Sequence, residues 1–379
     1  MILVTGATGH VGNVLVHDLA QSGEELRLFL QPTESVGSLS GIAFQLICGD
    51  IRDRETVMKA CEGVDYVYHL AGLIDIAPKD GELMNEVNVI GTRNIVEACL
   101  ANGVKRLVFT SSIHALPEQP IGTAFREVGA DAFPRTDLLG AYARSKSAAT
   151  AEVYKGIEKG LDAVMLFPTG IIGPGDYRGS EMGRVVRYLM GKSRSHLLPC
   201  FKGAYDFVDV RDVSSALIAA MRQGRKGEGY LIAGHRLSIP DLYRNVLKNV
   251  GRHSIRLVMF PLWLVRFASS IVLKWAHLLN RKPFFTPYSI DVLMSNSEVD
   301  ASKAARELNF KPRDMDDTLR ETVSWFDRLK AYGRLHGGRL LSYSRRQRKE
   351  LRRIQQEERP SAVSADAAKA PAPSMDKPR

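Results

Sequence analysis

Tyr142 and Lys146, in the segment "YARSK", combine a phenol and an amine at a spacing of four residues. A free phenol has a pKa of about 10 and is a poor base at neutral pH. On a helix the two side chains lie on one face, one turn apart, so the ammonium of Lys146 can favour a phenolate and lower the pKa of the phenol. Such pairs also occur by chance on exposed helices, so the meaning of this pair depends on its context.

A glycine-rich segment, "TGATGHVG", follows the first apolar run and places Gly6, Gly9 and Gly12 at intervals of three residues. Glycine permits a tight turn from a strand into a helix. It also lets a pyrophosphate approach the N–H groups at the start of that helix. Because the segment follows a predicted strand and opens a predicted helix, it indicates a dinucleotide-binding site.

The choice between the two nicotinamide dinucleotides depends on the end of the second strand. An acid there binds the ribose 2′-OH of NAD, whereas an arginine accepts the 2′-phosphate of NADP. In "LRLFLQPTES" the position is Gln31, which is neither. The lack of an acid favours NADP(H) and leaves NAD(H) as the alternative. After the third strand, Asp50 and Ile51 are placed to border an adenine, with a helix N-cap as the alternative role for Asp50.

The elements that must position these residues alternate along the chain. Mostly apolar strands are predicted at 2–5, 26–30, 43–47, 64–70, 106–111 and 163–168, and helices near 11–22, 53–62, 85–102 and 140–159. Apolar strands that alternate with helices are typical of a parallel sheet covered on both faces. The sequence therefore predicts an α/β fold of the Rossmann type, a doubly wound parallel sheet, with a smaller, mainly helical substrate subdomain.

We expect a nucleotide-binding domain over 1–169 with a return segment at about 205–233, a substrate subdomain over 170–204 and 234–330, and a tail over 331–379. The tail holds 12 Lys/Arg and 5 Asp/Glu, which is +7 of the chain's net charge of +10. Its Ala/Pro/Ser-rich end is typical of a segment that does not fold alone. Nucleic acid is not expected as a partner, because no aromatic residues interleave the charges of the basic run "RRQRKELRR" at 345–353.

The bulk composition is that of a soluble globular protein, with 45% hydrophobic and 25% charged residues among 379. Its four cysteines are widely spaced and form no Cys-x-x-Cys pair. We therefore expect neither a disulfide framework nor a metal site, and a reducing, cytoplasmic location. No signal peptide is expected, because "MILVTG" leads directly into the first strand.

Taken in order, "TGATGHVG", "GDIRD", "YHLAG", "NVIGTRNIVEAC", "VFTSS", "YARSK" and "PTGIIGPGD" resemble the extended short-chain dehydrogenase/reductases, the NAD-dependent epimerase/dehydratase superfamily. Within it the chain is most similar to the dihydroflavonol-4-reductase-like and 3β-hydroxysteroid-dehydrogenase-like branch, over about residues 1–330. The resemblance implies that Tyr142 is the general acid/base and that Lys146 also binds the nicotinamide ribose. It further implies that Ser112 orients the substrate oxygen and that Asn88 belongs to the same proton relay.

The expected cofactor contacts follow from the same motifs. They are Gly6, Thr8, Gly9, His10, Val11 and Gly12; Gln31; Asp50 and Ile51; Leu70, Ala71 and Gly72; Tyr142 and Lys146; and Pro168, Thr169, Gly170 and Ile171. The cofactor is NADP or NAD.

The chain departs from the sugar-nucleotide members of this family at two places. It has "SSIHALPE" where they often continue with Tyr-Gly, and Phe167 where they commonly carry an arginine. These departures favour a hydrophobic substrate, which is sterol-, terpenoid- or phenolic-like, and interconversion of a secondary alcohol and a ketone. A sugar-nucleotide epimerase or dehydratase is the first alternative. A protein that senses NAD(P) without turnover is the second.

The segment 257–279 is strongly apolar but contains Arg266 and Lys274, which makes it a poor membrane-spanning helix. Its polar residues Arg266, Ser270, Lys274 and His277 form one stripe on a helix. Either the helix packs over an apolar pocket, which is the favoured arrangement, or it lies in a membrane interface with its basic stripe towards headgroups. Peripheral contact with the inner face of a membrane, aided by the basic tail, stays open, as does a homodimer.

Overall fold

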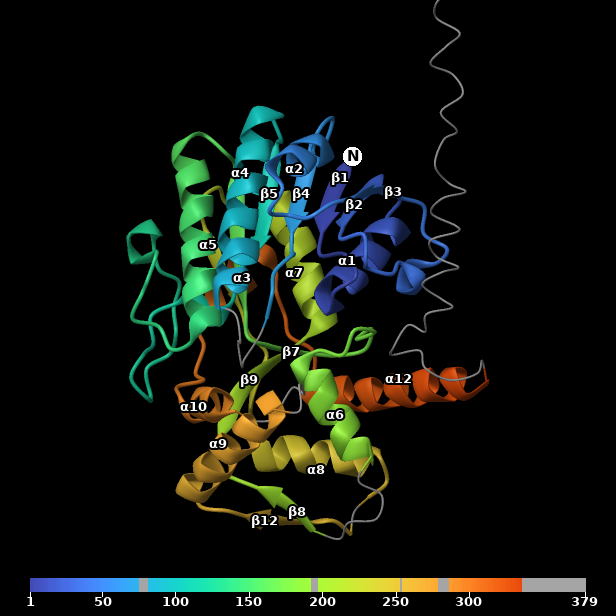
Figure 1. The fold of residues 1–379 in the computed structure, drawn as a ribbon, viewed down its shortest axis with the longest axis vertical. Helices are drawn as coiled ribbons and strands as arrows, with labels where there is room; N and C mark the ends of the chain where they lie inside the picture. The colour runs from blue at the N-terminus through green and yellow to red at the C-terminus, as the bar shows by residue number, and fades with distance from the viewer. Residues whose placement is uncertain (75–80, 192–196, 253, 279–285, 336–379) are drawn as a thin grey trace, which may run out of the picture.

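The computed structural model describes residues 1–74, 81–191, 197–252, 254–278 and 286–335. Most of the predicted tail, residues 336–379, therefore lies outside the described residues. The larger body is a seven-stranded sheet in the order β10-β6-β5-β4-β1-β2-β3 (Figure 1). Its strands are β1 Ile2–Thr5, β2 Leu26–Leu30, β3 Gln45–Cys48, β4 Tyr66–His69, β5 Arg106–Thr110, β6 Ala163–Pro168 and β10 Gly229–Ile232. All six pairings are parallel, for example Ile2 with both Leu26 and Tyr66.

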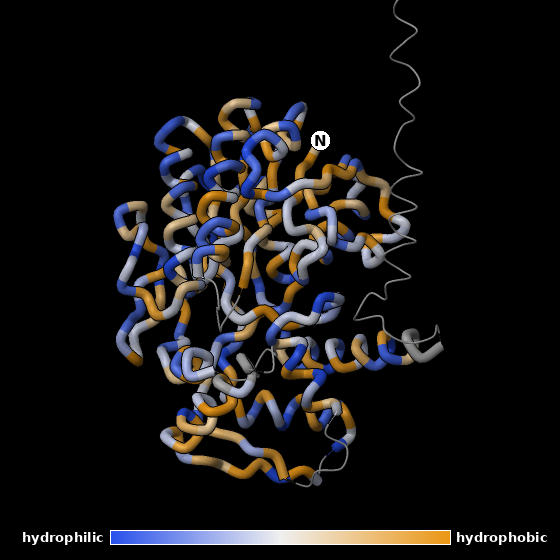
Figure 2. The backbone as a smooth tube through the Cα atoms, in the orientation of Figure 1, coloured by the Kyte–Doolittle hydropathy of each residue, from blue (hydrophilic) through white to orange (hydrophobic). Residues whose placement is uncertain are grey.

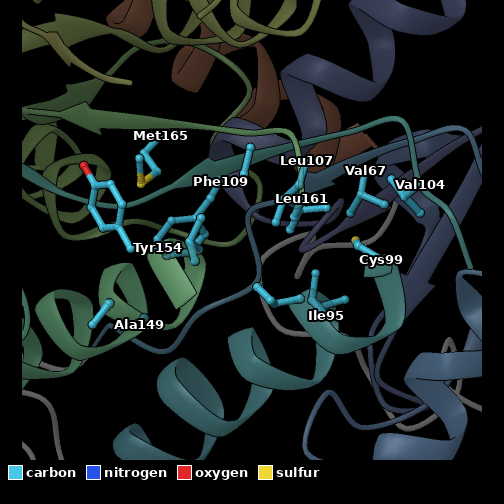
Figure 3. Packing of buried hydrophobic residues seen from close by; sticks show 14 of the residues in the cluster. Val67, Ile95, Cys99, Val104, Leu107, Phe109, Ala149, Tyr154, Leu161 and Met165 are labelled. Carbon is cyan, nitrogen blue, oxygen red and sulfur yellow. The ribbon is translucent and has the colours of Figure 1, made fainter. Parts of the chain in front are cut away.

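Helices cover both faces of this sheet, as the alternating pattern predicts. One face carries α2 Arg54–Ala60, α4 Gly91–Ala101 and α5 Ala141–Glu158; the other carries α1 His10–Gln21, α7 Val210–Gln223 and α11 Ser302–Leu308. Each layer has its own core of fully buried aliphatic and aromatic side chains. Figure 3 shows the first core, in which Val67 and Leu107 of the sheet face Ile95 and Cys99 of α4. The predicted fold class is confirmed.

A smaller body packs below the carboxyl ends of the strands (Figure 1). It contains the three-stranded sheet of β7 Gly170–Ile172, β9 Ala204–Asp209 and β11 His235–Ser238, and the pair of β8 Leu197–Cys200 and β12 Arg256–Met259. Its helices are α6 Glu181–Gly191, α8 Ile239–Asn249, α9 Leu262–Leu278, α10 Pro287–Met294 and α12 Met315–Leu335. A third core joins α6, α8 and α12.

Short helical segments complete the structure: η1 Gly37–Leu39, α3 Gly81–Asn85, η2 Glu86–Ile90, η3 Ile113–Ala115 and η4 Ala130–Ala132. The segment η2 is a π-helix between α3 and α4. Such single-turn insertions are rare overall, but those that occur are frequently located at functional sites. It carries Asn88, one of the predicted site residues.

The apolar segment 257–279 differs from its predicted structure in two ways. Its first residues pair with β8 as part of β12, and α9 begins only at Leu262, just after Pro261. Arg266 pairs with Asp291 of α10, so the basic side chain faces the protein and the large apolar side chains of α9 are exposed. The favoured expectation of a packed apolar face is therefore wrong for the described residues. None of the described helices combines the length and apolar character needed to cross a bilayer.

Candidate active site

The turn between β1 and α1 is packed so tightly that side chains at two of its glycines would clash with the backbone. Gly6 has a φ of +71°, and a Cβ on it would lie 2.7 Å from the Ala71 nitrogen. A Cβ on Gly12 would lie 2.2 Å from the Gly6 oxygen. Helix α1 begins at His10 with Gly9 as its N-cap, with no side-chain cap and no acid in its first turn. The first N–H groups of a helix have no partner within it, so this turn fits a pyrophosphate.

A segment of the smaller body lies against this turn. The His10 Nε2 is 3.0 Å from the Pro174 oxygen, while the buried His10 Nδ1 has no partner among the described residues. Arg178 donates to Glu34 (2.9 Å) and to the hydroxyl of Thr8 (3.2 Å), which itself donates to Glu34 (2.8 Å). Gln31, the residue singled out in the sequence, is exposed at the end of β2.

Glu34 is not among the residues predicted from the sequence to contact the cofactor. Its carboxylate lies three residues beyond Gln31 along the chain, yet it folds back onto Thr8 of the glycine turn with its side chain only 14% exposed. The signal was present as the acid in "QPTES". Only the tertiary structure shows that this loop turns towards the glycines.

Buried polar side chains hold the loop that follows β4. The Thr5 hydroxyl accepts a hydrogen bond from the Ala71 N–H (3.1 Å) and contacts the His69 ring (2.8 Å). The other ring nitrogen of His69 lies 3.0 Å from the Thr92 hydroxyl. Burial lowers the pKa of His69 to about 3, with the charge of Lys146 acting in the same direction. A neutral imidazole therefore ties β1, β4 and α4 together and fixes the predicted contacts Leu70 to Gly72.

Asn88 and Lys146 both place polar atoms close to Gly72 of this loop. The Asn88 side chain accepts from the Leu73 N–H (2.7 Å) and donates to the Leu73 oxygen (3.0 Å) and the Ser145 hydroxyl (2.9 Å). A Cβ on Gly72 would lie 3.2 Å from the Asn88 Oδ1 and 3.4 Å from the Lys146 Nζ. A side chain at position 72 would therefore crowd the polar atoms of both Asn88 and Lys146.

The Lys146 ammonium is held at the end of β5. Its Nζ donates to the Thr110 oxygen (2.8 Å) and lies 5.1 Å from the centre of the Phe109 ring. Burial lowers the pKa of Lys146 to about 8. A buried amine with one carbonyl partner has further donors free for a polyhydroxyl group such as ribose.

Tyr142 lies one turn before Lys146 on α5, as predicted, but the direction of its pKa shift is not the expected one. Burial raises the pKa of the Tyr142 phenol to about 12, and a hydrogen bond with Ser112 acts in the opposite direction. The spacing to Lys146 predicts a lowered pKa of the phenol, because a nearby positive charge favours the phenolate. Desolvation of the buried phenol acts in the opposite direction, and the spacing does not reveal it.

The two serines of "VFTSS" have separate roles. Ser111 contacts the Thr150 hydroxyl at 2.8 Å and joins β5 to α5. Ser112 is the N-cap of η3 and accepts from the His114 N–H at 3.3 Å, a long bond that leaves its hydroxyl available to Tyr142. The structure therefore brings Ser112, Tyr142, Lys146 and Asn88 to the carboxyl ends of β4 and β5.

A pocket opens beside Tyr142. His114 lines it, with its ring edge-on to Tyr142 at 6.2 Å between centres, and its Nε2 is 2.9 Å from the Tyr205 hydroxyl. Burial lowers the pKa of His114 to about 4. The apolar lining includes Ile113, Leu116, Phe125, Leu138, Val292 and Val299. The free space is about 30 Å³, which admits a water molecule but requires the walls to move for a larger ligand.

His114, Tyr205 and Tyr288 are not among the site residues predicted from the sequence. Tyr205 comes from β9, and Tyr288 of α10 fits against Gly140, where a Cβ would lie 2.4 Å from its ring. These residues are 63 and 146 positions from Tyr142 in the chain, so no local pattern connects them with it.

The remaining predicted contacts are already engaged within the protein. Asp50 pairs with Arg52, and Asp53, not Asp50, is the N-cap of α2. The Ile51 oxygen accepts from the Asn94 side chain at 3.0 Å. Thr169 donates to the buried Asp206 at 2.6 Å, while Gly170 and Ile171 pair with β9 directly after Pro168. Their contacts with a cofactor stay predictions.

Residues 2–233 match the model of the NAD dependent epimerase/dehydratase family, and the chain belongs to this family. It is an NAD(P)-dependent oxidoreductase of the extended short-chain dehydrogenase/reductase type. It is 34% identical to sterol demethylase protein B of Methylococcus capsulatus, covering 86% of this chain and 97% of that protein. It is 27% identical to 3beta-hydroxysteroid-dehydrogenase/decarboxylase isoform 1 of Arabidopsis thaliana, covering 84% and 75%.

Two solved structures illustrate the shared fold. The crystal structure of gox2253 has a TM-score of 0.72 and 27% identity, covering 89% of this chain and 98% of that one. The dTDP-glucose 4,6-dehydratase DesIV of Streptomyces venezuelae, solved with NAD bound, has a TM-score of 0.69 and 20% identity, covering 88% and 98%. The latter likeness shows the fold alone.

Proposed function

We propose that this protein interconverts a secondary alcohol and a ketone on a hydrophobic molecule of the sterol class. The observation that carries this proposal is the lining of the pocket beside Tyr142. It is mainly apolar and aromatic, its acids are Glu118 and Asp206, and its described residues include no lysine or arginine. A sugar nucleotide carries a diphosphate, which cationic side chains usually bind. Two relatives, a sterol demethylase protein and a 3beta-hydroxysteroid-dehydrogenase/decarboxylase, agree with this choice by their names.

The side chains of the site then have distinct tasks. A bound nicotinamide supplies or accepts hydride. Tyr142 donates a proton to the substrate oxygen in reduction and removes it in oxidation, while Ser112 hydrogen bonds the same oxygen. Lys146 has donors free for the nicotinamide ribose, and the hydrogen bond with Ser112 acts to lower the pKa of the Tyr142 phenol. Asn88 keeps loop 72–73 and α5 in register, and the N–H groups of the glycine turn hold the pyrophosphate.

We assign the cofactor to residues 1–169 with the return segment 205–233, and the substrate to 170–204 and 234–330. The pocket supports this division, because its walls come from both parts. His114 and Ala143 lie on the first, whereas Thr169 and Tyr288 lie at or beyond its boundary.

A screen of substrates tests the proposal. Purified protein with NAD is offered 3-hydroxysterols with and without a carboxyl group on the adjacent carbon, and nucleotide sugars. We expect NADH formation with hydroxysterols, and carbon dioxide release where the carboxyl is present, because oxidation places a ketone beside it. Turnover of nucleotide sugars alone would establish the sugar-nucleotide alternative.

We further propose that the preferred cofactor is NAD(H), although Gln31 alone favours NADP(H). In this fold the residues after the second strand bind the adenine ribose. Glu34 places a carboxylate against Thr8 there, with a side chain only 14% exposed. A carboxylate accepts a hydrogen bond from a 2′-OH and repels a 2′-phosphate. The Glu34 carboxylate also pairs with Arg178 and so engages a guanidinium that could otherwise bind a 2′-phosphate.

Replacing Glu34 with glutamine tests the cofactor choice. Wild type should bind NADH more tightly than NADPH, and Glu34→Gln should reduce that preference by about tenfold, because the like-charge repulsion is removed. Fluorescence titration with both reduced cofactors measures the ratio, with the exposed Glu24→Gln as the matched control. Tighter binding of NADPH by wild type would overturn this choice.

A further inference from the structure

One end of the molecule exposes eight large apolar side chains. They are Leu197 of β8, Met259 and Phe260 at the end of β12, and Trp263, Phe267, Ile271, Val272 and Trp275 of α9, which together we call the apolar end. The two tryptophans are 69% and 61% exposed. Figure 1 places α9, β8 and β12 at the end of the molecule far from the N-terminus, and Figure 2 shows hydrophobic colour along them. Contiguous exposed apolar surface of this kind marks an interaction site.

The exposed side chains of α9 follow the geometry of one helix face. Trp263, Phe267, Ile271 and Trp275 recur every four residues, so they form a single stripe about three turns long. The other side of α9 is occupied by the protein, because Arg266 pairs with Asp291 of α10 and Ser269 is buried. The stripe is thus the side that α9 presents outward.

Basic residues predominate in the chain segment that supplies most of the apolar end, although Arg266 is paired with Asp291. Residues 242–290 contain eight lysines and arginines and no aspartate or glutamate. Among them, Arg256 begins β12 with its side chain exposed, and Met259 of the apolar end is the last residue of the same strand. An acid-free basic segment around an apolar surface complements anionic lipid headgroups.

We propose that the apolar end docks onto the surface of a membrane that contains anionic lipid. Tryptophan favours the boundary between headgroups and acyl chains, and one stands at each end of the α9 stripe. A second copy of the chain fits less well, because a two-fold contact would bring two basic, acid-free segments together without compensating charge.

Docking would also place the membrane beside the active-site pocket. Helix α10 contacts α9 and is linked to it by the Arg266–Asp291 pair, and it lines the pocket through Tyr288 and Val292. A substrate dissolved in the bilayer would then have a short path past α10, the wall that must move to admit it. This delivery rests on the proposed function, whereas the docking does not.

Sedimentation of the full chain with vesicles tests the docking. We expect binding to vesicles of phosphatidylcholine with phosphatidylglycerol and weaker binding to phosphatidylcholine alone. The variant Trp263→Ser/Trp275→Ser should lower the partition coefficient by about tenfold or more, since burying one large apolar side chain is worth at least that factor. The matched control is Ile121→Ser, which removes an apolar side chain that is 84% exposed elsewhere. NADH titration verifies that each variant is folded and separates a failure of docking from a failure of the proposed function.

Tryptophan fluorescence provides a second readout. The third tryptophan, Trp325, packs against Tyr177 and Phe326, so a blue shift on adding vesicles should come from Trp263 and Trp275. Equal vesicle binding by wild type and the double variant would overturn the proposal, because the basic tail alone would then account for the binding. So would a wild-type dimer that the double variant converts into a monomer without change in vesicle binding.

Discussion

Tyr142→Phe should lower kcat by about a thousandfold while leaving the affinity for NADH within about twofold of wild type. The phenol is buried beside Ser112 and is the group placed to exchange a proton with the substrate oxygen. A positioned acid/base of this kind typically contributes a factor of about 10²–10⁴. Steady-state kinetics on a sterol substrate and fluorescence titration with NADH measure the two quantities separately.

Tyr154→Phe is the matched control, because Tyr154 is also a buried tyrosine of α5 but stacks on Phe133, away from the pocket. It should keep turnover near the wild-type value. A Tyr142→Phe protein with full turnover would remove the phenol from the chemistry. If neither protein turns over any substrate while both bind NADH, the alternative of a cofactor-sensing protein gains support.

Lys146→Met should give a protein that is more stable than wild type at pH 7 but at least about a hundredfold less active. Burial holds the pKa of Lys146 at about 8, against an ordinary value of 10.5. The folded state therefore carries a penalty for the buried charge of up to roughly 3 kcal/mol at neutral pH. Loss of the bond to the Thr110 oxygen offsets part of the gain.

The pH dependence of the stability difference between Lys146→Met and wild type identifies its cause. Below pH 8 both the folded and the unfolded wild type hold the proton, and the penalty is fully present. Between pH 8 and 10.5 the unfolded chain binds more protons, so wild-type stability rises with pH and the advantage of Lys146→Met shrinks. Denaturant unfolding of both proteins at pH 7 and pH 10 measures the stability difference and its decrease with pH. The exposed Lys155→Met, which removes an i,i+3 pair with Glu152, should change stability by no more than about 0.5 kcal/mol at either pH.

Local patterns in the sequence are sufficient to predict the fold, the phosphate-binding turn and the pairing of Tyr142 with Lys146. Apolar strands alternating with helices favour a parallel sheet, since the helices that connect such strands cover both faces of the sheet. The glycine spacing determines the phosphate turn, where Gly6 and Gly12 leave no room for a side chain. The helical period places Tyr142 and Lys146 on one face of α5. Each of these features depends on residues close together in the chain.

Tertiary structure alone decided the features that depend on burial and on distant residues. The pKa of Tyr142 rises because the phenol is desolvated, which the spacing to Lys146 does not reveal. His114 and Tyr205 meet only because η3 and β9 pack together, and Glu34 reaches Thr8 only through the fold of its loop. The apolar period of α9 is the same whether the stripe faces a core or solvent. Its exposure was decided by the packing of the opposite side against α10.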